Sequence, residues 1–358
     1  MSNRTGGWRR SLRWPALLVF GAAGLCAQAP GGRPQPWAAV DAFEQTAQMR
    51  RGVNIVGYDP IWKDFEKARF QERHFARIHE GGFQTVRVNL QAFAHMRANH
   101  DLDPAWLKTL DWVVENALAN RLTVILDEHD FQLCAKDAAG CRSKLLAFWE
   151  QIARRYRGAP SGVLFELLNE PHGELTPQLW NALLKDALAV VRKTNPTRNV
   201  VVGPAVWNTI GALGSLELPA GDRHIVVTVH YYNPMPFTHQ GARWSPENFK
   251  LSGIAWGTDA EKRRVVEDFA VAQKWSKAEN RPILLGEFGA YDKGDMESRV
   301  RYTAHLARTA ESLGWAWTYW QFDSDFIVYD MAQDDWVQPI WKALVPDADP
   351  ARPTGAAR

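Results

Sequence analysis

The segment Val163–Pro171 reads VLFELLNEP, an apolar run that ends in two polar residues and a proline. A strand that is buried on both faces is apolar almost throughout, so this run is typical of a parallel sheet covered by helices. Seven further short runs of the same kind occur along the chain. The eight predicted strands are Gly52–Val56, Thr85–Leu90, Leu122–Asp127, Val163–Leu168, Asn199–Gly203, Ile225–His230, Ile283–Gly286 and Trp315–Gln321.

Amphipathic stretches separate these strands. In Pro104–Asn120 the apolar residues recur three or four positions apart, as one buried face of a helix requires. Strands that alternate with helices predict an α/β fold, and eight of them predict a single (β/α)8 TIM barrel. The competing architecture is an open doubly wound sheet, but no G-x-G-x-x-G motif follows the first strand. The other predicted helices are Lys144–Tyr156, Pro177–Lys193, Asp259–Ala278 and Met296–Ser312.

The composition is that of a globular protein, with 46% hydrophobic and 23% charged residues in 358. It excludes a disordered or multi-spanning membrane protein. The net charge is +2, but the first 27 residues hold four arginines and no acidic residue, so the remainder carries −2. This balance argues against a nucleic-acid partner. The 17 tryptophans are a hint of sugar binding, because flat aromatic faces are what sugar rings stack on.

The N-terminus is typical of a secretory signal peptide. Arg9, Arg10 and Arg13 lead into the apolar run Trp14–Leu25, which is too short to span a bilayer comfortably. Cleavage after Ala27 would release a secreted or periplasmic protein that keeps no membrane segment. The predicted organisation is a signal peptide at 1–27, a flexible lead-in at 28–48, one barrel domain at 49–346 and a tail at 347–358. In an oxidising compartment we expect Cys134 and Cys141, seven positions apart, to form a disulfide.

Polar residues follow the apolar runs, where the carboxyl ends of barrel strands carry the chemistry. Two of them, Glu170 and Glu287, are carboxylates that would face one cavity. Such a pair can hydrolyse a glycosidic bond, one as proton donor and the other as nucleophile or base. Their mutual repulsion would raise the pKa of one, and a guanidinium such as Arg87 would keep the other ionised. The polar strand-end residues are Arg87, Asn89, Asp127, His129, Asp130, Asn169, Glu170, His230, Tyr232, Glu287, Trp320 and Gln321.

Four motifs, taken together, resemble the cellulases of glycoside hydrolase family 5. They are LNEP at 168–171, HYY at 230–232, GEFG at 286–289 and WTYW at 317–320, and the resemblance covers roughly residues 51–342. Asn-Glu-Pro alone is a weak signal, whereas the combination in this order is specific. The resemblance implies a retaining endo-β-1,4-glucanase in which Glu170 is the acid/base and Glu287 the nucleophile. It implies a β-glucan polysaccharide or oligosaccharide as substrate, a monomeric protein, no metal and no cofactor.

The same resemblance implies roles for the neighbouring residues. Asn169 would hydrogen-bond the 2-hydroxyl of the sugar in the −1 subsite, while Arg87 and Tyr232 would hold Glu287. His129 and His230 would line that subsite, and Trp320 would form a platform beneath the sugar. The stretch 233–244 resembles a substrate-side loop, which makes His239 and Trp244 candidate subsite residues.

One departure from the family concerns the loop after Trp320. Relatives often continue with small residues and glycine, whereas this chain has QFDSDF at 321–326. We expect Asp323 and Asp325 to narrow the cleft or to contact additional sugar hydroxyls. Glucan linkage and chain-length preference therefore stay open.

Several other functions compete with this interpretation. Within the family, the activity could be a β-1,3- or mixed-linkage glucanase, a β-mannanase or an exo-glucosidase, because specificity lies in the loops. A glycan-binding barrel without turnover is a further alternative. A metal-dependent hydrolase could use Asp127 and His129, but the first strand offers no His-x-His partner. A serine hydrolase would need a G-x-S-x-G elbow, which the sequence lacks.

Overall fold

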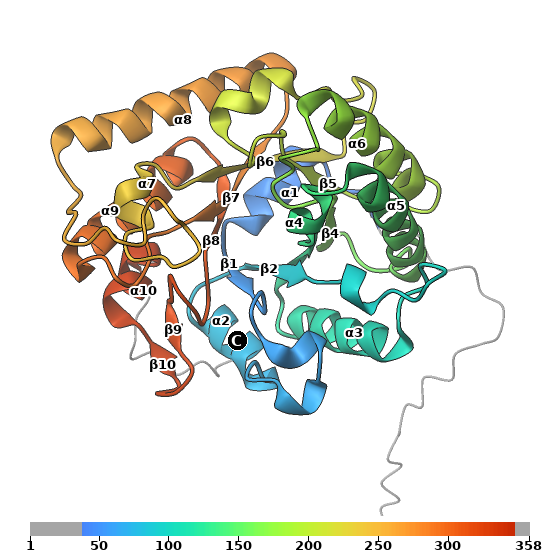
Figure 1. Cartoon of the computed structure of the whole chain (residues 1–358), viewed down its shortest axis with the longest axis horizontal. Helices are drawn as coiled ribbons and strands as arrows, with labels where there is room; N and C mark the ends of the chain where they lie inside the picture. The colour runs from blue at the N-terminus through green and yellow to red at the C-terminus, as the bar shows by residue number, and fades with distance from the viewer. Residues whose placement is uncertain (1–37, 348–358) are drawn as a thin grey trace, which may run out of the picture. The chain divides into compact units, whose positions relative to one another are not determined.

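The structure is a computed structural model that describes residues 38–347. Eight parallel strands form a closed barrel in chain order, and helices surround it (Figure 1). This confirms the predicted (β/α)8 barrel. The predicted signal peptide, the first ten residues of the lead-in and nearly all of the tail lie outside the described residues. The barrel strands are β1 (Arg51–Ile55), β2 (Thr85–Leu90), β3 (Thr123–Glu128), β4 (Val163–Glu166), β5 (Val200–Val202), β6 (Ile225–Tyr231), β7 (Ile283–Phe288) and β8 (Ala316–Tyr319).

The predicted helices are all present, and most ends agree within a residue or two. The largest difference is at α5, which begins six residues earlier than predicted because the Asp137 side chain caps its first turn and accepts a hydrogen bond from the Gly140 N–H. Between β5 and β6 the described chain forms the 3-10 helix η4 (Ile210–Ser215) in place of an α-helix. The main outer helices are α2 (Glu72–Glu80), α3 (Pro104–Ala119), α5 (Ala138–Arg155), α6 (Pro177–Arg192), α8 (Asp259–Glu279), α9 (Met296–Ser312) and α10 (Gln338–Leu344).

Short elements occupy the loops between these helices and the strands. Two one-turn helices, α4 and α7, follow β3 and β6 directly and so lie where the strands end. Among the described residues, no helix is both long and apolar enough to cross a bilayer. The short elements are α4 (Phe131–Cys134), α7 (Met235–Thr238), η1 (Pro60–Trp62), η2 (Phe65–Lys67), η3 (Phe93–His95) and the hairpin of β9 (Tyr329–Asp330) and β10 (Asp335–Trp336).

The prediction of a flexible lead-in over 28–48 is wrong for its last part, because residues 42–49 form the helix α1. Asp41 caps this helix by accepting a hydrogen bond from the Phe43 N–H. Ala42 and Met49 are buried against inward-facing side chains of six strands, β3 to β8. The helix therefore closes one end of the barrel. Its short length hid the apolar period from sequence inspection, and burial against the barrel supplies the stability that eight isolated residues lack.

The interior of the barrel changes from apolar to polar along the strands. Side chains two apart point to the same side of a strand, so each strand offers a short series of inward positions. The first series is aliphatic and packs against α1. The next inward positions carry polar side chains that are fully buried, namely Asn54, Arg87, Asp127, Glu166, Thr228 and Thr318. The strand ends beyond them hold the predicted site residues.

Candidate active site

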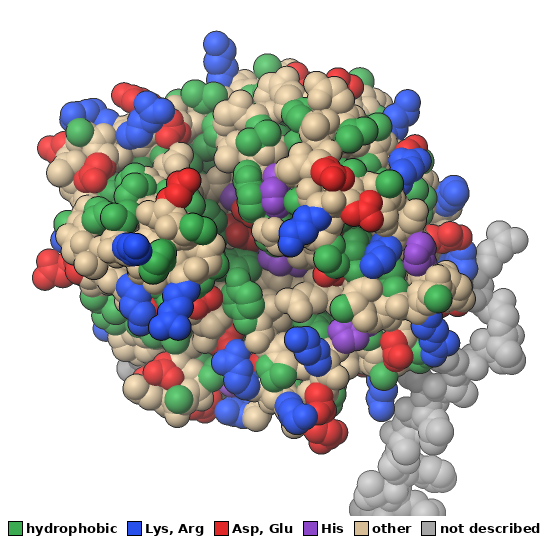
Figure 2. All heavy atoms as spheres, in the orientation of Figure 1, with side chains coloured by type: hydrophobic (Ala, Val, Ile, Leu, Met, Phe, Trp, Pro, Cys, Tyr) green, Lys and Arg blue, Asp and Glu red, His purple; other side chains and the backbone are tan. Residues whose placement is uncertain are grey.

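A cavity of about 1340 Å³ opens at the carboxyl ends of the strands. Figure 2 shows it as a hollow in which acidic and histidine side chains are visible between hydrophobic ones. The structure thus brings nearly all the predicted site residues together. Arg87 lies beneath the cavity, fully buried in the barrel. The predicted residues that line the cavity are His129, Asn169, Glu170, His230, Tyr232, His239, Trp244, Glu287 and Trp320.

Glu170 lies just beyond β4 and has a positive φ of 39°, in the left-handed region that non-glycine residues seldom adopt. Pro171 follows it, and the His172 Nδ1–H donates to the Glu170 carbonyl over 2.8 Å. The carboxylate is 2.7 Å from Nδ1 of His230. Burial raises the pKa of Glu170 to about 7, although His129 and Arg87 act in the opposite direction. A carboxyl group in this state is suited to donating a proton near neutral pH.

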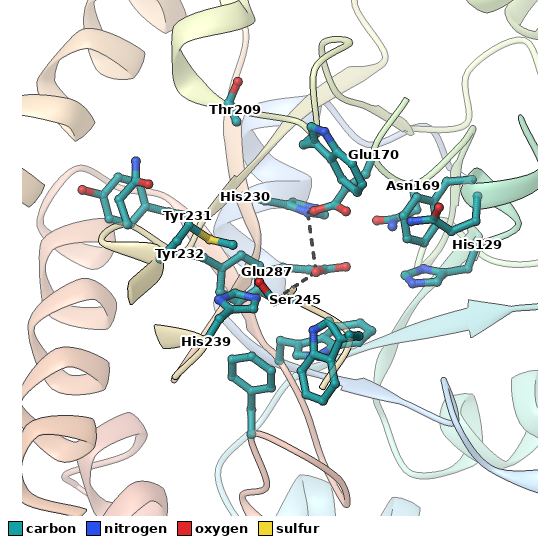
Figure 3. A pocket seen from close by; sticks show the side chains of 18 of the residues that line it. His129, Asn169, Glu170, Thr209, His230, Tyr231, Tyr232, His239, Ser245 and Glu287 are labelled. Carbon is teal, nitrogen blue, oxygen red and sulfur yellow. Dashed lines mark hydrogen bonds and ion pairs between the residues drawn. The ribbon is translucent and has the colours of Figure 1, made fainter. Parts of the chain in front are cut away.

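Glu287 lies at the same mouth of the barrel, on β7 and near Glu170 and His230 (Figure 3), and two side chains hold its carboxylate. Arg87 donates from Nη1 to Oε1 over 2.8 Å, and the Tyr232 hydroxyl donates to Oε2 over 2.9 Å. A carboxylate oxygen of Glu170, a ring nitrogen of His230 and a carboxylate oxygen of Glu287 lie within 4.8 Å of one another. The two carboxylates are therefore close enough for one to attack a sugar carbon while the other protonates the departing oxygen.

The two glycines of the GEFG motif are required by close packing. A Cβ on Gly286 would be 2.3 Å from Oγ1 of Thr228 and 3.0 Å from Nε2 of His230. A Cβ on Gly289 would be 2.6 Å from the Trp320 carbonyl oxygen. Any larger residue at 286 or 289 would displace these neighbours, which lie in or next to the site. Glycine is therefore needed at both positions for Glu287 to reach the cavity.

Arg87 organises the buried layer below the cavity. Its guanidinium binds Glu166 through two hydrogen bonds of 2.7 and 2.8 Å and also contacts Asn54, Asn169 and Glu287 at 2.8 Å each. Asp127 is a third carboxylate partner, at 3.1 Å. Because Oδ1 of Asn169 accepts from Arg87, the amide NH₂ is the group available to a sugar hydroxyl.

Glu166 is a functional candidate that the sequence analysis missed. It is buried four residues before Glu170, and its two carboxylate oxygens hold Arg87 in the orientation that reaches Glu287. It lies inside the motif segment that drew attention to Glu170. The signal that could have revealed it is the strand alternation, which points Glu166 inward beside Arg87 and Asp127.

His129 and Trp320 form the wall next to Asn169. Their rings are stacked with centroids 5.6 Å apart and planes 9° apart. Nδ1 of His129 is 2.5 Å from Asp127. Burial alone would lower the pKa of His129, but the Asp127 carboxylate outweighs it and raises the pKa above its usual value. Trp320 lies one residue beyond β8, at the cavity.

His239 and Trp244 both line the cavity, beside Tyr232 and Tyr291 respectively. Trp244 is 50% exposed, so its ring offers a free face, whereas His239 is buried and its pKa is lowered to about 4 by that burial. On the opposite wall, Trp207 lies 41% exposed and stacks on His172 with ring centroids 3.4 Å apart. Trp207 was not among the predicted site residues.

The loop after β8 places its two aspartates differently from the expectation. Asp323 is buried and pairs with Arg69 at 2.7 Å, away from the sugar path. Asp325 has a φ of 57°, and its carbonyl accepts the Asp292 N–H. Of this loop, the cavity lining includes Phe326 and neither aspartate. The expectation that the two carboxylates narrow the cleft or contact sugar hydroxyls is wrong for Asp323, because its side chain is buried against Arg69 and does not line the cavity.

The comparisons with known proteins agree with this geometry. The family described as "Cellulase (glycosyl hydrolase family 5)" matches residues 41–325. The chain belongs to glycoside hydrolase family 5. Endoglucanase H of Acetivibrio thermocellus is 29% identical over 305 residues, which cover 82% of this chain and 32% of that protein. Endoglucanase 3 of Fibrobacter succinogenes is 24% identical over 337 residues, covering 79% of this chain and 50% of that protein.

The chain thus spans a third to a half of those two family 5 relatives. Among solved structures, endoglucanase Cel5A of Thermotoga maritima is 37% identical, with a TM-score of 0.82, and the match covers 85% of this chain and 100% of Cel5A. Cellulose synthase subunit Z of Clostridioides difficile is 34% identical, with a TM-score of 0.79 and coverage of 83% and 99%. The match to these two solved structures therefore extends over nearly the whole of their chains, barrel included.

The alternative of a metal-dependent hydrolase would need Asp127 and His129 to bind the metal ion. The Oδ2 atom of Asp127 already contacts Arg87, Asn89 and His129 at 3.1 Å or less. A guanidinium beside this carboxylate repels a cation. The donor pair of Asp127 and His129 therefore does not fit a metal.

Cys134 ends α4, and its sulfur is bonded to that of Cys141 in α5. Both residues are buried. The helix α4 lines the cavity with residues 131–133, and Phe131 lies edge-on to His129 at a centroid distance of 5.1 Å. The bridge therefore tethers one wall of the cleft to the outer helix layer.

We predict that Glu166→Gln lowers kcat/KM about 10- to 100-fold, since it replaces one of the two carboxylate oxygens that accept hydrogen bonds from Arg87. The matched control is Glu128→Gln on β3. Glu128 is equally buried, but burial raises its pKa well above the usual value, so the neutral amide resembles its native state. Steady-state kinetics together with the thermal unfolding midpoint provide the measurement. Activity of Glu166→Gln within twofold of the wild type would show that the pair does not position Glu287.

A second prediction concerns pH. Because the pKa of Glu170 is raised to about 7 and the protonated form is the donor, kcat/KM should fall about tenfold per pH unit above pH 7. In Glu170→Ala, measured on a substrate whose activated leaving group needs no acid, this basic limb should disappear. If the limb persists in that variant, a group other than Glu170 is the titrating acid.

Proposed function

We propose that the protein is a retaining endo-β-1,4-glucanase. The observation that carries the proposal is the pair Glu170 and Glu287, whose carboxylate oxygens lie within 4.8 Å across an open cavity. Retaining glycosidases hold their two carboxyl groups about 5–5.5 Å apart, whereas inverting enzymes leave room for a water between them. The short separation therefore favours direct attack by one carboxylate.

In the first step, an oxygen of Glu287 attacks the anomeric carbon while Glu170 gives its proton to the glycosidic oxygen. The leaving sugar departs as an alcohol, and a glycosyl ester on Glu287 remains. Arg87 and Tyr232 hold the two oxygens of the nucleophile, so its orientation is set before the substrate arrives. The NH₂ of Asn169 would bind the 2-hydroxyl as charge develops on the ring.

In the second step, Glu170 acts as a base. It removes a proton from water, the hydroxide oxygen attacks the anomeric carbon, and the bond to Glu287 breaks. Two inversions give net retention. Burial lowers the pKa of His230 to about 4, so its ring is neutral beside Glu170 near pH 7. Glu170 is therefore the proton donor of this pair.

Endo action is supported by the shape of the cavity. Its lining includes, besides the glutamates, Tyr58 and Gln91 after β1 and β2, and Ile210 and Val271 of η4 and α8. A volume of about 1340 Å³ exceeds that of usual small-molecule sites. A polymer could thus be bound across the site and cut internally. The β-1,4-glucan substrate is supported by the relatives named endoglucanase and by the Cel5A structure with cellobiose.

Mannan is the second candidate substrate. Structures of Thermotoga maritima Cel5A also exist with mannotriose, and that enzyme is 37% identical to this chain. The geometry around Glu170 and Glu287 is neutral between the two sugars, because these residues act on the anomeric carbon and the glycosidic oxygen. The loops around the cavity therefore determine the preference between glucan and mannan, and assays on both polymers distinguish the two candidates.

Action as a monomer, with no nucleic-acid or membrane partner, is part of the proposal. Both catalytic carboxylates lie on one chain, so the proposed chemistry needs no second subunit. Catalysis without a cofactor is likewise proposed, because protonation and attack need only the two glutamates.

Wild-type protein should release reducing ends from carboxymethylcellulose and mixed-linkage β-glucan with a rapid fall in viscosity, and act weakly on laminarin and mannan. Glu287→Gln should lose at least about a thousandfold in kcat, because the nucleophile is gone, while still binding oligosaccharide. Reducing-sugar and viscosity assays in parallel are the measurement. Mannan as the preferred polymer would favour the second candidate, and near-wild-type turnover by Glu287→Gln would refute the catalytic assignment.

Export is proposed from residues 1–27 and is supported by the disulfide between Cys134 and Cys141, since such bonds persist outside the reducing cytosol. Expressed in a bacterial host, the protein should be recovered from the periplasm or medium with an N-terminus at Gln28. Mass spectrometry of the intact protein measures this. Full-length protein retained in the cytoplasm would contradict export.

A further inference from the structure

The active-site cavity extends beyond the glutamates to the outer helix α8. Its lining at this end includes Ile210 and Gly211 at the start of η4 and Arg264, Asp268 and Val271 of α8. The helix η4 packs against α8, so the two elements form one continuous border. Thr209, just before η4, lies at the edge of the pocket beyond His230 in Figure 3. None of the α8 residues has a role in the chemistry described above.

The side chains of α8 that reach the cavity share one face of the helix. Positions 264, 268 and 271 are four and three residues apart, which places them above one another. Nε of Arg264 pairs with Oδ1 of Asp268 at 3.1 Å, and the Tyr231 hydroxyl donates to Oδ2 of Asp268 over 2.8 Å. Asp268 is thus fixed by β6, the strand that also carries His230.

These residues present both polar and apolar groups to the cavity. Arg264 is 72% exposed, so most of its N–H donors point to open space. Val271 is 57% exposed, and Met235 of α7 is 39% exposed nearby on the same lining. Sugar units present hydroxyls at their edges and C–H groups on their faces. The combination of a guanidinium, a carboxylate and aliphatic side chains matches both features.

The position of this surface defines which part of a substrate could reach it. Asn169, His129 and Trp320 mark the side of the cleft where the sugar is held by Glu287, and Tyr58 continues that side by packing edge-on to Trp320 at 6.3 Å. The α8 surface adjoins η4, and Thr209, just before η4, lies beyond Glu170 and His230 as seen from Glu287 (Figure 3). The proton donor faces the leaving group, so this end receives the part of the chain that departs first.

We propose that Arg264, Asp268 and Val271, together with Ile210 and Met235, form a binding site for the leaving-group end of the glycan. We call this set the α8 subsite. It holds neutral β-linked sugar units beyond the first leaving unit. The inference rests on the proposed function and adds to it a region of the enzyme that selects for long substrates.

The test compares Arg264→Ala with Arg263→Ala. Arg263 is the adjacent residue, is also exposed and carries the same charge, but it lies away from the cavity beside Asp259 and Lys262. For each protein, kcat/KM is measured on a six-unit oligosaccharide and on an aryl disaccharide whose leaving group ends at the aryl ring. In Arg264→Ala the ratio of the first value to the second should fall about three- to tenfold, the size of one exposed polar interaction. In Arg263→Ala the ratio should stay at the wild-type value.

The cleavage pattern of the six-unit substrate provides a second readout. Loss of the α8 subsite should reduce those cuts that leave two or more units on the leaving side. An unchanged ratio and pattern in Arg264→Ala would overturn the proposal, as would an equal change in both variants. The oligosaccharides are taken from whichever polymer, glucan or mannan, the wild type hydrolyses. Failure on both polymers refutes the proposed function itself and the α8 subsite with it.

Discussion

The buried guanidinium of Arg87 is the constraint on which the site depends. A charge inside a barrel is costly unless it is paired and fully hydrogen-bonded. Here three carboxylates, Glu166, Asp127 and Glu287, lie within 3.1 Å of it. Meeting that demand requires strands β2, β3, β4 and β7 to bring their polar residues to one point. The barrel register and the active site therefore satisfy the same electrostatic requirement.

The same network makes two chemically identical side chains behave differently. Glu287 receives hydrogen bonds from Arg87 and Tyr232, one on each carboxylate oxygen, and they fix its orientation. Glu170 lies beside His230, and burial raises its pKa to about 7. One carboxylate is suited to attack and the other to donate a proton. This difference arises from the surroundings, as in other sites where two carboxylates have two roles.

The walls of the cleft come from loops and short helices, whereas its floor comes from the barrel strands. The disulfide of α4, the stacked pair of His172 and Trp207, and the Arg69 partner of Asp323 each fix one wall segment. The disulfide spans seven positions, whereas the other two contacts join residues far apart in the sequence. They hold in place the segments along which a bound glycan would extend, while Glu170 and Glu287 would act on the bond placed between them.

The sequence by itself determined the eight strands, the barrel and the two glutamates, because apolar runs and strand-end motifs are local patterns. It did not reveal α1, whose stability comes from packing Met49 against the barrel, or Glu166, which matters only through a guanidinium 79 residues away. It also wrongly placed Asp323 in the cleft, since no neighbouring residue in the sequence indicates the ion pair with Arg69. Tertiary structure alone decided these points, because burial, ion pairing and the joining of η4 to α8 depend on contacts between segments that are distant along the chain.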